Sequence, residues 1–351
     1  MPCSARGAGK TVTMPVRPSI RPEAAEYLVP PPDDPRLHAT VEALLDAGGD
    51  AICALALYGS HVQASTPDRW SAYDFLLVTD SYPTLFRNLT QKGHHSRPPW
   101  LLTALNHFLP PNIISFDVGG EGQAMAKCAV VNPRHLNRAL RRYSPDHFLK
   151  GRVVQKLALV WTRGEAEEDA LVSALRMARE GIVYWVRPLM PNRFDLEEFA
   201  RTMLKVSYRG EIRPENPGRV VQVFEAQRET LLGIASEALV SAERDGVVIR
   251  DGETLGWARN PGIATKLYHH VYFGLSKVRA TTRWFKYMIT FDGWLDYVVR
   301  KIERRAGLTI EVEERERRWP LIFLWPKLFQ VLRAVKEADS TSNQESNGAG
   351  E

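Results

Sequence analysis

Two apolar runs separated by a polar loop make residues 51–80 the most informative stretch of the chain. The first run ends in Tyr58-Gly59-Ser60, a loop of thirteen residues follows, and Asp74 opens the second run, which Asp80 closes. Short apolar runs bounded by Gly, Ser and Asp are typical of buried strands. The pattern therefore predicts a strand, a tight turn, a loop and a second strand.

The spacing of apolar residues predicts further elements on both sides of this stretch. Apolar positions three and four residues apart predict an amphipathic helix over 34–47, which Gly48-Gly49 would end. A hairpin of two strands is expected over 113–117 and 126–131, and after Pro133 the pattern becomes helical. The other expected helices cover residues 83–88, 98–108, 145–156, 165–185 and 195–205.

The turn between the first two strands has the chemistry of a phosphate site. A glycine after a buried strand lets the backbone approach a ligand closely, and free amides with a serine hydroxyl can hold phosphate oxygens. A carboxylate at the start of the next strand can bind the Mg2+ that accompanies a nucleoside triphosphate. This arrangement of Gly59-Ser60, a polar spacer and Asp74 in an apolar strand resembles the nucleotidyltransferase superfamily.

One position departs from that superfamily. Its members usually carry two acids at alternate positions of the second strand, so that both side chains emerge on one face, but here the alternate position is Leu76. Either the second metal ligand comes from elsewhere or the site is inactive. Asp117 lies where the superfamily has its third carboxylate, which makes it a candidate metal ligand or general base. Glu121 is the fallback, and a simple turn acid is the alternative.

Four segments resemble a narrower family, the mitochondrial-type phosphatidate cytidylyltransferases, also called translocator assembly and maintenance proteins. The segments are Tyr58-Gly59-Ser60 with Asp74-Phe75 and Asp80, Asn88-Leu89 with His95-Ser96, Lys127 with Val130-Val131, and Ser207-Tyr208-Arg209-Gly210-Glu211-Ile212-Arg213. The chain departs from the family at Cys128-Ala129, where the family has Tyr-Gly, and it has no His within 82–87.

The resemblance implies a Mg2+-dependent reaction of CTP with phosphatidic acid that yields CDP-diacylglycerol and pyrophosphate, a step in phosphatidylglycerol and cardiolipin synthesis. It implies that Asp74 and Asp80 hold the metal ion, with Asp117 as a third catalytic acid. The implied nucleotide-binding residues are Tyr58, Gly59, Ser60, Lys127, Tyr208 and Arg213. Two alternatives stay open: a nucleotidyltransferase that acts on a soluble or protein acceptor, and a non-catalytic nucleotide-binding scaffold.

Lys127 and three histidines have competing interpretations. An unpaired ammonium is costly to bury in a strand, so Lys127 is expected to face the triphosphate, with a rim lysine as the alternative. His61 is expected to be a solvated loop residue. The pair His94-His95 is either a phosphate contact or a surface pair.

The expected fold class is α+β: a nucleotidyltransferase-like mixed-sheet domain, a helical domain that the resemblance makes winged-helix-like, and an amphipathic C-terminal region. The expected boundaries are 1–33 for a disordered N-terminal arm, 34–140 and 141–278 for the two domains, 279–335 for the C-terminal region and 336–351 for a disordered tail.

Composition and charge narrow the classes of partner. With 44% hydrophobic and 25% charged residues the chain has an ordinary globular composition. Residues 279–333 carry twelve Lys/Arg against seven Asp/Glu, a surplus as large as the net charge of +5 of the whole chain, so no nucleic-acid partner is expected for the helical domain. The three cysteines lack metal-ligand spacing, and Cys53 and Cys128 fall in expected core strands, which indicates a reducing compartment.

The C-terminal region is expected to touch a membrane. It places aromatic residues among Arg279, Arg283 and Lys286 and ends in the apolar run 319–329. Tryptophans beside cations are typical of the interface of an anionic bilayer, and a packed helical pair is the alternative. The expected membrane-contacting residues are Trp319, Leu321, Phe323 and Trp325. The expected location is peripheral, on the cytoplasmic face of a bacterial membrane or the matrix side of the mitochondrial inner membrane.

Overall fold

The computed structural model describes residues 22–63, 71–117, 125–144, 146–209, 217–306 and 313. The chain divides into two compact units, Met1–Lys286 and Tyr287–Glu351. The first unit holds every strand and nearly all of the helices in the described part of the chain. The two units are considered separately below.

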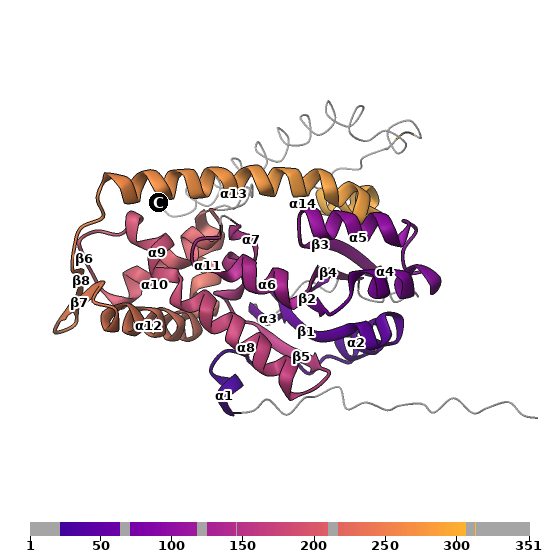
Figure 1. Cartoon of the computed structure of the whole chain (residues 1–351), viewed down its shortest axis with the longest axis horizontal. Helices are drawn as coiled ribbons and strands as arrows, with labels where there is room; N and C mark the ends of the chain where they lie inside the picture. The colour runs from indigo at the N-terminus through magenta and orange to yellow at the C-terminus, as the bar shows by residue number, and fades with distance from the viewer. Residues whose placement is uncertain are drawn as a thin grey trace, which may run out of the picture. The chain divides into compact units, whose positions relative to one another are not determined.

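A mixed sheet of five strands organises one part of the first unit (Figure 1). Its spatial order is β3-β4-β2-β1-β5, in which β2 and β4 run parallel and all other neighbours run antiparallel. The strands are β1 (Ile52–Tyr58), β2 (Tyr73–Thr79), β3 (Asn112–Asp117), β4 (Met125–Val131) and β5 (Ala158–Thr162). The expected α+β class and the four expected strands are confirmed.

Helices cover both faces of this sheet, and the strand residues alternate between two cores. Leu55, Phe75 and Cys128 pack against one layer of helices, and Ala54, Leu76 and Ala129 against the other. The first layer is α2 (Pro35–Gly48), α4 (Tyr82–Gln91) and α5 (Pro99–Phe108); the second is α6 (Pro133–Leu140), α7 (His147–Val153) and α8 (Glu165–Glu180). A sheet buried on both faces explains why the strands are continuously apolar.

Polar side chains cap the first turn of two of these helices. The Asp34 carboxylate accepts a hydrogen bond from the backbone N–H of Arg36 at the start of α2, and Pro35 occupies the first turn. Ser81 begins α4 in the same way, because its hydroxyl accepts from the N–H of Thr84. Such caps satisfy backbone N–H groups that have no partner within the helix, each worth about 1 kcal/mol.

The rest of the first unit is mostly helical and has its own core. It contains α9 (Ile182–Val186), α10 (Leu196–Ser207), α11 (Pro217–Ala226), α12 (Arg228–Arg244) and most of α13 (Ile263–Thr290). A small antiparallel sheet joins them, in the order β6 (Arg193–Phe194), β8 (Thr254–Trp257) and β7 (Val248–Asp251). The short elements α1 (Pro22–Ala25), α3 (Ser60–Gln63), η1 (Gly49–Ala51) and η2 (Arg187–Leu189) complete the unit.

The described part of the second unit contains the last turn of α13 and α14 (Trp294–Ala306). The rings of Phe291 and Tyr297 pack with their centroids 5.5 Å apart and hold the start of this helix. Across the described ranges of the whole chain, none of the helices combines the length and apolarity needed to cross a bilayer.

The packing corrects two expected boundaries. Residues 22–33 are not a free arm, because Tyr27 and Leu28 are buried and Val29 forms a bridge with Ala158. The first domain does not end at 140, because the sheet takes β5 from residues 158–162. The expected end of the second domain at 278 falls within α13.

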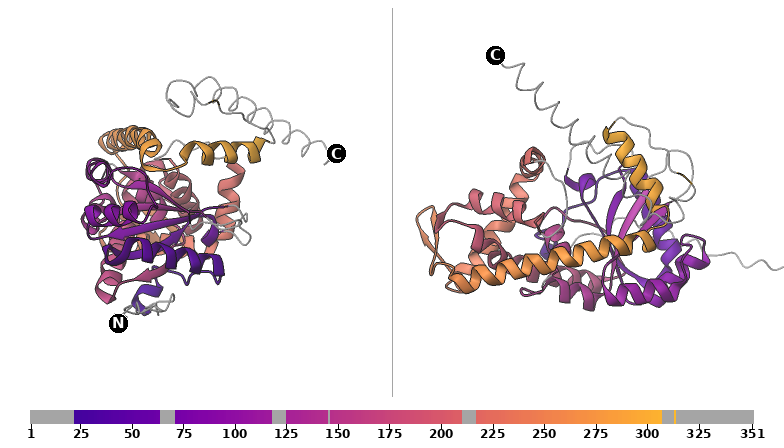
Figure 2. Two further views of the ribbon diagram at one scale, coloured as in Figure 1. Left: turned by 90° about the vertical axis from the view of Figure 1, so that its right-hand side faces the viewer. Right: turned by 90° about the horizontal axis from the view of Figure 1, so that it is seen from above.

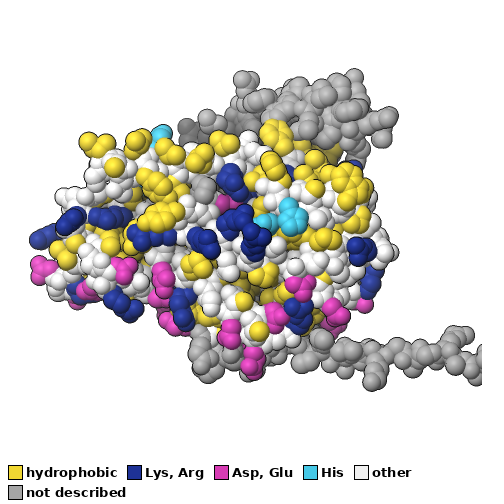
Figure 3. Space-filling model, viewed as in Figure 1, with side chains coloured by type: hydrophobic (Ala, Val, Ile, Leu, Met, Phe, Trp, Pro, Cys, Tyr) yellow, Lys and Arg dark blue, Asp and Glu magenta, His cyan; other side chains and the backbone are white. Residues whose placement is uncertain are grey.

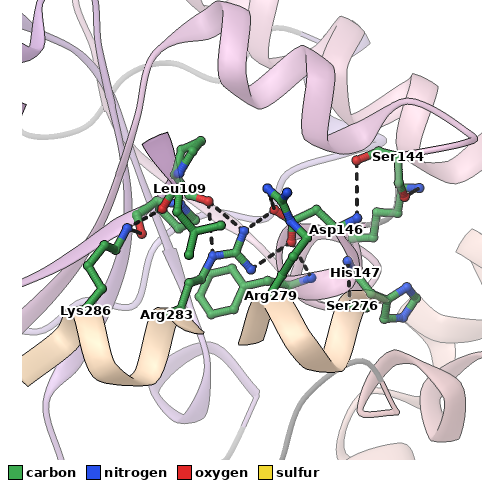
Figure 4. Close-up of polar contacts among 12 residues, drawn as sticks. Leu109, Ser144, Asp146, His147, Ser276, Arg279, Arg283 and Lys286 are labelled. Atoms are coloured by element: carbon green, nitrogen blue, oxygen red, sulfur yellow. Dashed lines mark hydrogen bonds and ion pairs between the residues drawn. The ribbon is translucent and has the colours of Figure 1, made fainter. Parts of the chain in front are cut away.

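The cations of α13 correct a third expectation. Arg283 is only 1% exposed, and its guanidinium donates to the Asp146 carboxylate and, at 2.6 Å, to the carbonyl of Pro110 (Figure 4). Lys286 is also buried and donates to the carbonyls of Leu109 and Pro111. These two cations attach α13 to the fold, so they do not belong to a membrane-facing surface.

Candidate nucleotide-binding site

One end of the five-stranded sheet gathers most of the predicted site residues. The register places Asp74 of β2 opposite Tyr58 of β1 and opposite Lys127 of β4. Residues directly opposite in a sheet project from the same face, so these three side chains are neighbours. The Gly59-Ser60 turn follows β1 at this same end.

Gly59 has a backbone that only glycine adopts without strain. Its φ is +82°, in the left-handed region that other residues rarely occupy. A Cβ atom at this position would lie 2.9 Å from Oδ2 of Asp74. The turn therefore needs glycine for its conformation and for the close approach of the Asp74 carboxylate.

Asp74 and Lys127 form a half-buried pair of opposite charges. Oδ1 of Asp74 lies 3.7 Å from Nζ of Lys127, and the two side chains are 29% and 20% exposed. The carboxylate lowers the cost of placing an ammonium within a strand. Both groups remain open to solvent, so they can meet a charged ligand at this end of the sheet.

The residues around Ser60 are held by contacts that sequence reasoning missed. His61 was expected to be solvated, but it is buried, and its ring packs on Tyr73 with centroids 4.2 Å apart. Its Nε2 lies 2.9 Å from the carbonyl of Ser71, and the hydroxyls of Ser60 and Ser71 are 3.4 Å apart. His61 therefore fixes the turn to the start of β2.

The hydroxyl of Tyr73 extends this support to the first helix. It donates to the Asp34 carboxylate, and burial together with that acid raises the pKa of Tyr73 well above its ordinary value. The tyrosine therefore stays neutral as a hydrogen-bond donor and joins the start of β2 to the start of α2.

Gln155 joins the turn to the segment around Tyr208. Its Oε1 accepts hydrogen bonds from Nε2 of Gln63, at 2.7 Å, and from the hydroxyl of Tyr208, at 3.2 Å. Its Nε2 donates to the carbonyl of Gly151 at 3.0 Å, and the side chain is buried. The structure thus brings Tyr208 to the same end of the sheet as Gly59, through a residue that no sequence motif indicated.

Gly151 and Arg152 of α7 complete this end. A Cβ atom on Gly151 would lie 2.3 Å from the carbonyl oxygen of Ser207, so glycine lets α7 pack directly on the end of α10. The guanidinium of Arg152 lies 5.7 Å from the ring centre of Tyr58 and 3.6 Å from that of Phe148. Arg152 therefore adds a cation to the candidate site.

Asp80 does not belong to this site. It follows the last residue of β2, six positions beyond Asp74, and a strand rises about 3.3 Å per residue, so the two acids lie about 20 Å apart. Asp80 is exposed and pairs with Arg163 at 2.8 Å. The prediction that Asp74 and Asp80 share one metal ion is wrong, because an ion with bonds of about 2 Å cannot reach both.

Asp117 lies at the correct end of the sheet but is not beside Asp74. It is exposed at the end of β3, and β4 with Lys127 lies between the two acids. Two strand spacings and two residues along the strand separate their Cα atoms by about 12 Å. The fallback Glu121, Arg213 and the membrane-contacting set Trp319, Leu321, Phe323 and Trp325 lie outside the described residues.

The paired histidines have ordinary packing roles. The ring of His94 packs on Phe116, next to Asp117, with centroids 4.6 Å apart. His95 is buried, and its Nδ1 accepts the backbone N–H of Arg97 at 3.1 Å. Asn88, from the same resembling segment, donates to the carbonyl of Gly48 at 2.8 Å. This segment therefore stabilises the fold behind the site.

The donor set suits a metal ion that arrives with its ligand. Mg2+ is usually held by one or two carboxylates together with substrate phosphates, and Asp74 supplies one such carboxylate beside the glycine turn. Within the described ranges, the acids, histidines and cysteines do not form a group of three that could hold a metal by themselves.

The two comparisons with known proteins add nothing to this geometry. The chain matches no protein-family model and no curated protein.

Proposed function

We propose that this protein is a Mg2+-dependent nucleotidyltransferase that transfers the cytidylyl group of CTP to phosphatidic acid. The observation that carries the proposal is the convergence of Gly59, Asp74, Lys127 and Tyr208 at one end of the sheet. These residues come from three of the four segments that resemble the phosphatidate cytidylyltransferases. Segments far apart in the sequence meet where a triphosphate site would require them.

The reaction needs alignment more than activation. An oxygen of the lipid phosphate attacks the α-phosphorus of CTP, and the new P–O bond forms as the bond to the bridging oxygen breaks. Pyrophosphate leaves with that electron pair. The attacking oxygen is already anionic near neutral pH, so the protein has to position the two phosphates and neutralise the charge that develops on the leaving group.

The roles of the residues follow from their positions. The Gly59-Ser60 turn would hold phosphate oxygens through backbone amides and the serine hydroxyl. Asp74 would hold Mg2+ together with the triphosphate, and the ion supplies charge neutralisation at the leaving group. Lys127 and Arg152, which both lie at this end, would provide further positive charge. Asp117, exposed at the same end of the sheet, would face the acceptor.

The order of elements after the large sheet supports the winged-helix part of the proposal. The chain runs β6, α10, α11, α12, β7 and β8, and the short strand β6 pairs with β8 at the edge of a β7-β8 hairpin. Helices followed by a hairpin that pairs with an earlier strand are the arrangement of a winged helix. The proposed lipid acceptor also implies a peripheral membrane location, on the cytoplasmic or matrix face.

The test compares two acids of the same strand. Purified protein is assayed for CDP-diacylglycerol formation from CTP, Mg2+ and phosphatidate vesicles. Asp74→Asn should lower activity at least about a hundredfold, because loss of a metal ligand in the transition state costs several kcal/mol. Asp80→Asn is the matched control, and it should keep near wild-type activity because Asp80 lies at the far end of β2.

Two results would overturn the proposal: wild-type protein that makes no CDP-diacylglycerol, or an Asp74→Asn variant with full activity. Thermal melts with each of the four nucleoside triphosphates and Mg2+ test base choice, since a ligand that binds only the folded protein raises its melting temperature. CTP should raise it most.

A non-catalytic nucleotide-binding scaffold is the second candidate, and Leu76 favours it. Leu76 occupies the position of the usual second acid, is only 2% exposed and packs in the core under α6, α7 and α8. Asp80 does not replace it. Binding of Mg2+-CTP without turnover on phosphatidate or on soluble acceptors would identify the scaffold.

A further inference from the structure

α13 runs along the outside of the first unit (Figure 2, right), and one side of this helix is apolar and exposed. Six side chains between residues 267 and 285 define it, and each is between 41% and 63% exposed. We call these six the α13 face: Leu267, Tyr268, Val271, Leu275, Val278 and Phe285. In Figure 3 hydrophobic side chains recur along the upper edge, where α13 runs. Contiguous apolar surface of this kind usually marks an interaction site.

The opposite side of the same helix accounts for its attachment to the fold. His269, Tyr272, Phe273 and Ser276 are buried, and Arg283 and Lys286 donate to the 109–111 segment. The buried residues His269, Tyr272, Phe273 and Ser276 are spaced three and four residues apart, which places them on one side of a helix. The α13 face is therefore a second apolar surface that the first unit's own packing does not use.

The charge of the helix indicates which partner fits. Between Ile263 and Thr290 the sequence has five Lys/Arg and no Asp or Glu. Two of these cations, Lys266 and Lys277, are exposed on one flank of the α13 face. On the other flank Arg279 is half-exposed beside Asp146, and its buried Nε–H has no acceptor among the described residues. Cations thus border the apolar face on both sides.

A second copy of the chain fits this surface poorly. The steps of three and four residues between Tyr268, Val271, Leu275 and Val278 would suit a coiled-coil seam. Such seams are flanked by pairs of opposite charge, and α13 has no acid to pair with the lysines of another α13. An apolar stripe bordered only by cations instead matches a bilayer with anionic headgroups, where apolar side chains enter the acyl boundary and cations meet lipid phosphate.

We propose that the α13 face binds the surface of an anionic lipid bilayer. Lys266 and Lys277 then lie at headgroup depth on one flank and Arg279 on the other. The idea that this surface delivers a lipid acceptor to the transferase site rests on the proposed function, but the binding of vesicles by the α13 face does not. The α13 face precedes in sequence the run 319–329 that the sequence analysis indicated.

The test uses the full chain and vesicles that contain no substrate. Co-sedimentation is measured with phosphatidylcholine alone and with phosphatidylcholine plus phosphatidylglycerol. Wild-type protein should pellet with the anionic vesicles only. The double variant Leu275→Asp, Val278→Asp should bind at least about tenfold more weakly, because two apolar contacts are replaced by anions. Both side chains are exposed, so the fold should survive, and a thermal melt checks this.

Two further variants separate apolar from electrostatic contributions. Lys266→Gln with Lys277→Gln should weaken binding about fivefold per lysine, which corresponds to about 1 kcal/mol for each cation near an anionic surface. Added salt should reduce this difference. The matched control is Val240→Asp on α12, a helix on the other side of the helical part from α13 (Figure 1); this side chain is 46% exposed, and the variant should bind like wild type.

The outcomes distinguish the two proposals. Equal vesicle binding by wild type and the Leu275→Asp, Val278→Asp variant overturns the α13 proposal. The proposal is also overturned if wild-type protein does not bind vesicles but forms a dimer in sedimentation velocity, and the Leu275→Asp, Val278→Asp variant is a monomer. If wild type binds vesicles through the α13 face but makes no CDP-diacylglycerol, only the proposed function fails.

Discussion

Asp146 faces two arginines of α13, Arg279 and Arg283. In the described part of the chain it is the acid that pairs with both, and Asp146→Asn should remove this negative charge. Asp146 is 4% exposed and Arg283 is 1% exposed. Nη1 of Arg283 donates to Oδ1 of Asp146 at 2.9 Å, and Nη2 of Arg279 lies 3.5 Å from Oδ2 (Figure 4). Asp146→Asn keeps the size of the side chain and leaves a buried guanidinium without its counter-charge.

The expected loss is about 3–5 kcal/mol in the free energy of unfolding, the usual cost of breaking a buried ion pair on one side. Asp146 also caps α7 through the backbone N–H of Phe148, at 3.2 Å. Asn is an equally good cap, so the loss reports the charge. For a chain of this size the melting temperature should fall by about 1–2 °C per kcal/mol.

Urea unfolding followed by circular dichroism measures this change. The double variant Asp146→Asn, Arg283→Met should recover part of the loss, because the unpaired charge is gone. A loss below about 1 kcal/mol for Asp146→Asn, or a double variant no more stable than the single one, would refute the reasoning.

The same pair predicts an acid dependence. Burial raises the pKa of Asp146, but the charge and hydrogen bonds of Arg283 outweigh it, so the pKa in the folded protein lies below its ordinary value. The pair therefore contributes stability that is fully present above the unfolded pKa and is lost as pH falls through the folded pKa. Asp146→Asn should remove this part of the acid dependence.

Three further predictions concern the site and its support. Gly59→Ala should weaken Mg2+-CTP binding, measured by calorimetry, at least about tenfold, because the new Cβ would displace the Asp74 carboxylate. The positive φ at this position adds backbone strain of about 1–2 kcal/mol. Gly93→Ala is the control for strain alone, because Gly93 has a φ of +77° and open space around its Cβ. Gln155→Leu removes the acceptor that joins α3 to the end of α10 and should raise the KM for CTP more than it lowers kcat; an unchanged KM would show that this bridge does not position the site. Burial lowers the pKa of Lys150 to about 8 in the folded protein. Between about pH 8 and 10 this lysine is therefore protonated in the unfolded chain and neutral in the folded protein, so the free energy of unfolding should rise by about 3 kcal/mol over this range. Urea unfolding should show that Lys150→Met removes this rise.

The sequence predicted the elements that position the site, because their patterns are local. The alternation around Asp74, the glycine after β1 and the hairpin of β3 and β4 each depend on adjacent residues. Lys127 was expected to face the triphosphate, and the structure adds that the pairing of β2 with β4 places it beside Asp74. The prediction for Asp80 came from the family resemblance and ignored the length of the strand, because six residues separate two carboxylates by far more than one ion can span.

The missed residues depend on packing between distant segments. Gln155 stands in no motif, and its role exists only because Gln63 and Tyr208 reach it from elsewhere in the chain. Arg283 lies in a segment whose composition is typical of a membrane-facing helix, yet its guanidinium is buried because it donates to Asp146 and to the carbonyl of Pro110. No spacing rule in a single sequence reports such partners.

The attachment of α13 at both ends has a mechanical consequence. Tyr272 and Phe273 pack in the core of the helical part, and ten to fourteen residues later Arg283 and Lys286 donate hydrogen bonds to the segment that leads into β3. The α13 helix therefore links the sheet part and the helical part of the first unit and opposes a hinge between them. Substrates would then have to enter the candidate site by small local movements at the end of the sheet. A force on the exposed side of α13 would act on the sheet part and the helical part together.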